Sequence, residues 1–186
     1  CDEVKQVDTV PFGCFKREVF DKVGLYDNEL IRNQDDELNG RIVKNGGKIY
    51  LIPSIITKYY ARDKISKVRK MFYQYGLYKP LVNKKLGAPA TIRQFFPLVF
   101  VLGLIFGAIL SCLSWIIAVM YFSVIILYLL LACFFTFKSV RKTGKMRLFV
   151  YQPLTYLTVH VSYGWGYLVG IYKILMHKPF NAESNR

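Results

Sequence analysis

The sequence predicts a mixed α/β polar part followed by an α-helical membrane part. Eleven of the twelve acidic residues lie at or before Asp63, whereas residues 95–137 carry no charged side chain. That run of 43 residues would extend roughly 65 Å as a helix, about twice the hydrocarbon thickness of a bilayer. Eight Lys or Arg and no acid occupy residues 64–93, directly before the run. The net charge of +14 therefore indicates a partner of anionic lipid rather than nucleic acid.

The polar part, residues 1–63, alternates short strands and helices. A strand leading into a loop is predicted for residues 7–15, and a second short strand for residues 48–52. A short helix over residues 17–23 is expected to end at Gly24, whose missing Cβ suits a left-handed C-cap. A second helix over residues 35–44 has acids in its first turn and cations near its end, which the helix dipole favours.

Residues 64–94 are predicted to form a basic amphipathic helix, over residues 64–79, and a linker. Ile65, Val68 and Phe72 recur at helical spacing, and lysines occupy the opposite face. Because this helix directly precedes the apolar run, we expect it to lie flat at the membrane surface. The alternative is a helix packed into a core, with its charged face in solvent.

The apolar run is predicted to form a transmembrane hairpin, with helices near residues 95–113 and 115–137. Gly103 and Gly107 have the spacing of residues at which helices approach closely. The loop at 138–147 holds five cations and no acid, so both ends of the hairpin are expected in the cytoplasm.

Residues 148–175 are predicted to be a third, less regular transmembrane or re-entrant segment, followed by a tail at 176–186. His160 within this segment either lines a polar path or is hydrogen-bonded inside the helix bundle. The predicted location is the plasma (inner) membrane, multi-pass, with the polar part in the cytoplasm.

The strongest chemical signal is the acidic cluster Asp35-Asp36-Glu37 at the start of a helix. Backbone N–H groups and the helix dipole keep carboxylates ionised there. A carboxylate at a loop-to-helix junction can take a proton from a sugar hydroxyl as that hydroxyl attacks an anomeric carbon. Taken by itself, the cluster fits ordinary helix capping better than catalysis.

Three motifs in order place this cluster in a wider pattern. They are VPFG at residues 10–13, VGLYD at 23–27 and QDDELNGR at 34–41. Their order and spacing resemble the inverting family 2 glycosyltransferases, especially the succinoglycan-type exopolysaccharide transferases. The resemblance implies the C-terminal part of a GT-A (Rossmann-like) domain, with Asp35 as the catalytic base. It also implies that Gly13, Asp36 and Glu37 contact the acceptor or support the base.

Two further positions fit that family less closely. Gln74 lies in a variant of the family's Gln-x-x-Arg-Trp motif that lacks the Trp, and Arg62 follows two tyrosines. The resemblance implies a donor-phosphate or interfacial role for both. The family's divalent cation, Mg or Mn, is bound by an Asp-x-Asp motif that this sequence does not contain. The cation is therefore expected to be held mainly by residues outside the chain, and the chain, which starts at Cys1, is expected to be a C-terminal fragment that is inactive alone.

These observations predict part of a membrane-bound hexosyltransferase of exopolysaccharide or cell-surface glycan biosynthesis. Its expected partners are a nucleotide-sugar donor, a lipid-linked or polysaccharide acceptor, and the membrane. The alternative is a non-catalytic membrane anchor or assembly module of a polysaccharide synthesis or export complex. A small transporter or channel is disfavoured because the apolar spans contain no charged residue.

Overall fold

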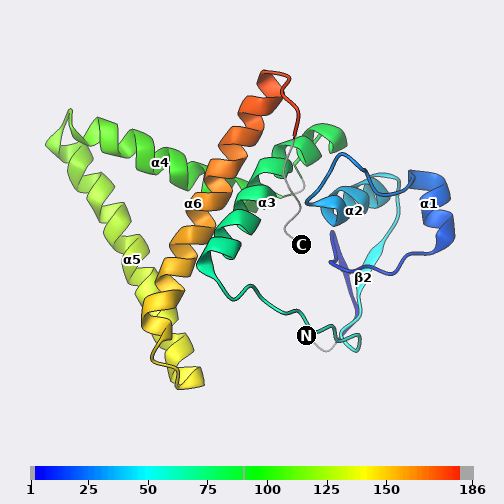
Figure 1. Ribbon diagram of the computed structural model, residues 1–186, viewed down its shortest axis with the longest axis horizontal. Coiled ribbons are helices and arrows are strands. Elements are labelled where there is room, and N and C mark those ends of the chain that lie inside the picture. Colours follow the sequence, from blue (N-terminus) through cyan, green and yellow to red (C-terminus); the bar gives the residue numbers. More distant parts are fainter. Residues whose placement is uncertain (1–2, 90, 181–186) are drawn as a thin grey trace.

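The computed structural model describes residues 3–89 and 91–180, and the chain is mostly helical (Figure 1). The polar part contains β1 (Lys5–Val7), α1 (Arg17–Val23), α2 (Gln34–Lys44) and β2 (Ile49–Leu51). The helical part contains α3 (Ile65–Leu86), the 3-10 turn η1 (Ile92–Phe95), α4 (Phe96–Ser111), α5 (Trp115–Thr143) and α6 (Leu148–Leu175).

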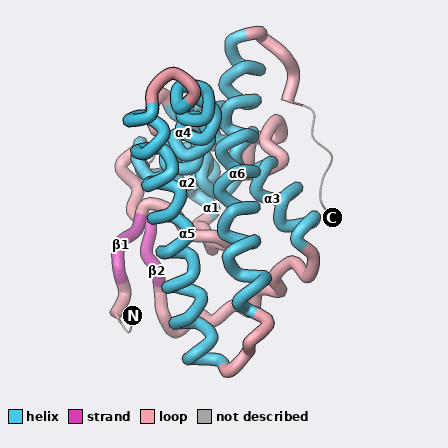
Figure 2. Tube along the Cα trace, turned by 90° about the vertical axis from the view of Figure 1, so that its left-hand side faces the viewer, coloured by secondary structure: helices cyan, strands magenta, loops and turns pink. Residues whose placement is uncertain are grey.

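The polar part is a small α/β unit built around helix α2. Strands β1 and β2 pair antiparallel, with Val7 opposite Ile49, and lie side by side in Figure 2. Leu38 and Ile42 of α2 are buried with Ile49. The aliphatic and aromatic side chains packed around them come from β1, the loop after it and α1: Val7, Val10, Phe15, Val19, Phe20 and Val23.

The predicted elements of this unit are present with shifted boundaries. The first strand ends at Val7, so most of the segment predicted as strand and loop at 7–15 is loop. Helix α1 is capped by Gly24, as predicted, and its φ of 82° is positive, but its ψ of 174° lies outside the left-handed helical conformation that the sequence predicts. Within the described residues the sheet has two strands, so the Rossmann-like domain expected from the resemblance stays a prediction.

Helix α3 is longer than the sequence predicts and runs to Leu86, through Pro80. Its second half is buried rather than amphipathic. Leu77, Tyr78, Leu81, Val82 and Leu86 of α3 form a core cluster with Leu30. The Tyr78 hydroxyl donates to the Phe180 carbonyl at 3.0 Å. The helix then ends at Gly87, which takes the left-handed conformation.

Helices α3 and α6 cross along a seam of glycines. A Cβ on Gly166 would overlap the carbonyl oxygen of Tyr73, and one on Gly76 would overlap that of Tyr163. Gly164 and Gly170 make similar backbone approaches, to α4 and to α3. Of the predicted close pair on α4, Gly107 lies directly against the ring of Tyr121 on α5, whereas nothing lies within 4 Å of a Cβ built on Gly103.

Two helical segments of the described chain are long and apolar enough to cross a membrane, Ile92–Ser111 and Trp115–Thr143. Only 11% and 6% of their most apolar windows are buried, unlike a core helix of a soluble protein. They correspond to the predicted hairpin. Helix α6 is a continuous helix rather than the irregular segment expected, and it packs on α3, α4 and α5. A third span there stays a prediction.

Residue His160 of α6 is hydrogen-bonded inside this bundle. Its Nδ1 lies 2.9 Å from the Tyr128 hydroxyl of α5. The edge of its ring faces Phe100 of α4, with 6.0 Å between ring centroids. This arrangement favours the bundle histidine of the two alternatives that the sequence leaves open.

Candidate functional site

The loop before α2 is fixed to α3 by polar contacts. Asn33 has left-handed backbone angles, φ 61° and ψ 24°, and its Nδ2 donates to the Tyr75 carbonyl at 3.0 Å. Arg32 Nε donates to Gln74 Oε1 at 3.1 Å. Since these two residues immediately precede the acidic cluster, the loop-to-helix junction is held against the middle of α3.

Glu37 of the cluster is used inside the polar part. Its carboxylate accepts two hydrogen bonds from Arg41, at 2.7 and 2.8 Å, and its side chain is 4% exposed. Arg41 also donates to the carbonyls of Val23 and Leu25. The bidentate pair therefore joins the acidic motif to the VGLYD turn, and both carboxylate oxygens are engaged.

Asp36 connects three elements. Its carboxylate is 2.6 Å from Lys79 Nζ on α3 and accepts from the Thr9 hydroxyl at 3.1 Å. Asn39 Nδ2 in turn donates to Thr9 Oγ1 and to the Val10 carbonyl. This network fixes the loop after β1, which carries Gly13, to α2 and α3.

Asp35 differs from both neighbours. It is half-buried, and within the described ranges its carboxylate has no ion pair and accepts a hydrogen bond from the Asp36 N–H at 3.0 Å. Burial raises the pKa of Asp35 above its ordinary value, and the negative charge of Asp36 raises it further. Of the three acids, Asp35 is the one whose carboxylate is half-buried and is not paired with a cation among the described residues.

The surroundings of Asp35 are cationic and aromatic. Burial raises the pKa of the Tyr75 phenol, Asp35 and Tyr59 raise it too, and Arg32 and Arg62 lower it. The Arg32 guanidinium lies 5.7 Å from the centre of the Tyr75 ring. One half-buried carboxylate and two guanidinium groups thus share the electrostatic environment of this phenol.

The structure assigns different surroundings to the remaining predicted residues. Gln74 is 2% exposed and orients Arg32. Arg62 is exposed, ahead of α3. Gly13 follows Phe12, whose φ is 55°, and lies against the ring of Phe15.

Arg32 and Tyr75 are site residues that the sequence reasoning did not identify. Tyr75 lies at helical spacing with the apolar residues and beside Gln74 in the variant motif, but the sequence assigns a site role to neither Tyr75 nor Arg32. The available signal was weak: Arg32 stands three residues before the acidic cluster, and Tyr75 next to Gln74.

The described residues do not supply a cluster suited to a divalent cation. Among residues 3–89 and 91–180, no group of three or more His, Cys, Asp or Glu is placed to hold a metal. Asp36 and Glu37 are each bound to a cation of the protein. A metal held mainly outside this chain stays a prediction.

With this geometry in view, the chain is similar to glycosyltransferases of glycan biosynthesis, which confirms the resemblance predicted from its motifs. One relative is the dolichyl N-acetyl-alpha-D-glucosaminyl phosphate 3-beta-D-2,3-diacetamido-2,3-dideoxy-beta-D-glucuronosyltransferase of Methanococcus voltae. It is 28% identical over 167 residues, 89% of this chain and 48% of the relative. Another is the succinoglycan biosynthesis protein ExoA of Rhizobium meliloti, 33% identical over 98 residues, 53% of this chain and 29% of the relative.

The chain thus spans about half the length of the first relative. No family model matches the chain, and no solved structure matches it.

Proposed function

We propose that this chain is part of a membrane-bound inverting glycosyltransferase, in which Asp35 is the general base. The observation that carries the proposal is that the three carboxylates of the acidic cluster have different partners. Asp36 is paired with Lys79 and Glu37 with Arg41, which leaves Asp35 half-buried with a raised pKa. A raised pKa makes the ionised carboxylate a stronger proton acceptor.

The proposed reaction is a single in-line displacement. The acceptor hydroxyl gives its proton to the Asp35 carboxylate as its oxygen bonds to the anomeric carbon of the donor sugar. The bond from that carbon to the diphosphate oxygen breaks, and the nucleoside diphosphate leaves with the electron pair. Arg32 and Arg62, the two guanidinium groups near Tyr75, are proposed to supply positive charge for the leaving diphosphate, which departs from the face of the anomeric carbon opposite the attacking hydroxyl.

Three further parts of the proposal concern the enzyme as a whole. The polar part is proposed to belong to a GT-A domain whose donor half, with its divalent cation, lies outside this chain; the described residues hold no site for that cation. The acceptor is proposed to be lipid-linked, because the base lies on α2, which packs on α3, and α3 packs on α6 of the helical bundle; one relative is also named for a dolichyl-linked substrate. The location proposed is the plasma membrane, with the polar part in the cytoplasm.

The test is Asp35→Asn in the intact enzyme that contains this chain. Membranes are incubated with a panel of radiolabelled UDP-hexoses, and transfer to extractable lipid is measured. General-base catalysis contributes about 10²–10⁴-fold, so transfer is expected to fall by about that factor. Asp21→Asn on α1 is the matched control, since this exposed acid undergoes the same chemical change and transfer is expected to stay within about twofold.

A second readout in the same experiment is the pH dependence. With Asp35 as base, the acid limb of kcat/KM should fall at a pH above the ordinary aspartate range, because the pKa of Asp35 is raised. Retention of most activity by Asp35→Asn, with normal expression and membrane insertion, would favour the membrane anchor or assembly module instead.

A further inference from the structure

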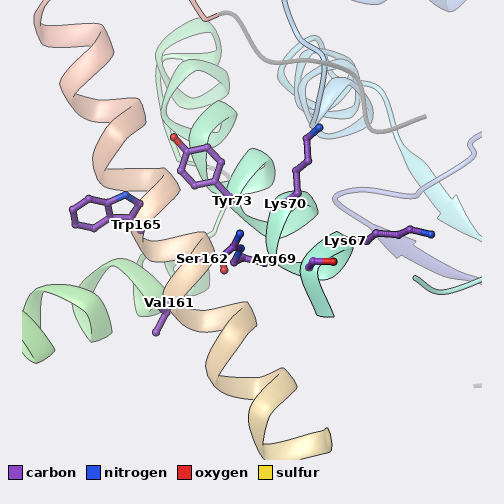
Figure 3. A pocket seen from close by; sticks show the side chains of 8 residues that line it. Lys67, Arg69, Lys70, Tyr73, Val161, Ser162 and Trp165 are labelled. Carbon is purple, nitrogen blue, oxygen red and sulfur yellow. The ribbon is translucent and has the colours of Figure 1, made fainter. Parts of the chain in front are cut away.

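A cavity of about 670 Å³ lies between the first half of α3 and the middle of α6, apart from the acidic cluster (Figure 3). Ser66, Arg69, Lys70 and Tyr73 of α3 line one wall at helical spacing, together with Lys67. The other wall comes from α6: Val161, Ser162 and Trp165. Helix α3 therefore presents one face to this cavity and another, at Tyr75 and Lys79, to the acidic cluster.

The chemistry of the lining is that of an anion site with an apolar side. Arg69, Lys67 and Lys70 contribute cations, and among residues 3–89 and 91–180 no acid lines the cavity. In the described chain near it, Asp63 pairs with Lys67 at 2.8 Å. Arg69 of α3 and Ser162 of α6 line the same cavity, one from each helix (Figure 3). A guanidinium can give a phosphate two parallel hydrogen bonds, and a neighbouring hydroxyl can add a third.

The glycine contacts of α6 show where the cavity lies relative to the membrane. Gly164 packs on the carbonyl of Pro97, at the start of the first apolar helix, and Gly166 packs on the carbonyl of Tyr73. The residues of α6 that line the cavity, 161–165, lie in the same stretch of helix as these two glycines. The cavity therefore lies level with the end of a membrane-crossing helix, which is the depth of lipid head groups.

The apolar wall continues toward that helix. Trp165 is 51% exposed and Val161 is 36% exposed, next to a cationic rim. Tryptophan at this depth is typical of the membrane–water interface. A soluble anion would leave this wall in water, whereas a lipid covers it with the first methylenes of its chain while its phosphate meets the cations. The volume is also within the range of pockets that bind small molecules, about 300–1,000 Å³.

We propose that this cavity binds the anionic phosphate head group of a membrane lipid, with Arg69 as its principal cation and Trp165 against the lipid chain. Both a bulk anionic phospholipid and a polyprenyl phosphate carrier present this chemistry. The site stands on its own residues and does not depend on the role of Asp35.

The test uses the full 186-residue chain in detergent with Trp115→Phe, so that Trp165 is the remaining tryptophan. Phosphatidylglycerol with brominated chains is titrated, and quenching of Trp165 fluorescence is measured. In this background, the Arg69→Gln, Lys70→Gln double variant is expected to raise the concentration for half-quenching at least about tenfold. The matched control removes one Arg and one Lys from the other basic segment, as Lys145→Gln, Arg147→Gln, and is expected to change it by less than about twofold.

Competition identifies the source of the phosphate. Displacement of the brominated lipid by polyprenyl phosphate at lower concentration than by unlabelled phosphatidylglycerol indicates a carrier site, and equal displacement indicates a general head-group site; either supports the proposal. The proposal is overturned if the two double variants lose quenching equally. It is also overturned if brominated phosphatidylcholine quenches as well as brominated phosphatidylglycerol, or if inorganic phosphate displaces the brominated lipid as well as unlabelled phosphatidylglycerol does. Asp35→Asn should leave the quenching unchanged, so this result and the transferase result fail independently.

Discussion

The two surfaces of helix α3 are built by different physical means. Toward the polar part, α3 is joined by side-chain bonds over long sequence distances, such as Arg32 to Gln74 and Lys79 to Asp36. Toward α6, it is joined by backbone approach at glycines. The first surface tolerates adjustment of individual side chains, whereas the second is fixed by shape. The polar part, which holds the proposed catalytic base, thus contacts α3 through adjustable side chains, while α3 itself is packed rigidly on α6.

The largest effect is expected at the glycine seam. Gly166→Ala places a methyl group where it overlaps the Tyr73 carbonyl, so α3 and α6 must move apart. Overpacking of this kind costs about 1–3 kcal/mol or more, and the thermal midpoint of the detergent-solubilised chain should fall by several degrees. Gly103→Ala is the matched control, because its Cβ meets nothing within 4 Å. Equal midpoints for the two variants would show that the seam is not a packing constraint.

A smaller and more local effect is expected on the polar surface. Lys79→Met keeps the stem of the side chain but leaves the Asp36 carboxylate without its cation, which is 2.6 Å away in the structure. Removing one partner of a partly buried pair costs about 1–3 kcal/mol, less where water can enter. Hydrogen exchange should therefore rise in the loop after β1, which Asp36 holds through Thr9, while α6 stays protected. A uniform rise over α6 would contradict the separation of the two surfaces.

This contrast also explains which features the sequence predicted. The helix at 17–23 with its glycine cap and the apolar hairpin follow from local signals, namely turn chemistry and runs of uncharged residues. The extension of α3 to Leu86 was missed because Pro80 and the lysines that follow resemble a helix end, while burial against α6 keeps the segment helical. Tertiary packing overrides such local signals.

The candidate site was predicted less completely than the helices. Motif order located the acidic cluster, and the resemblance singled out Asp35 as the base, but neither predicted how the three carboxylates differ in their contacts. The distinction depends on partners far along the chain: Lys79 for Asp36, and the carbonyls that Arg41 reaches beside Glu37. No periodicity encodes a hydrogen bond between Arg32 and Gln74, which lie 42 residues apart.

The smallest effect is the change in stability when Asp35 is replaced. The sign of this change distinguishes an acid that serves function from one that stabilises the fold. Because the folded chain raises the pKa of Asp35 above the ordinary value of 3.8, the folded state binds this proton more tightly than the unfolded state does. The stability contributed by the group is fully present below the ordinary value and is lost as pH rises through the folded pKa. At neutral pH the ionised carboxylate is therefore a cost to the fold.

Asp35→Asn removes that cost. The thermal midpoint of the variant, relative to the unchanged chain, should rise between pH 4.5 and pH 7.5 and then level off. Lys79→Met should act in the opposite direction at neutral pH, because it removes a favourable contact. If Asp35→Asn instead lowers the midpoint at pH 7.5, the carboxylate stabilises the junction of α2 with α3, and its burial is structural rather than an adaptation for proton transfer.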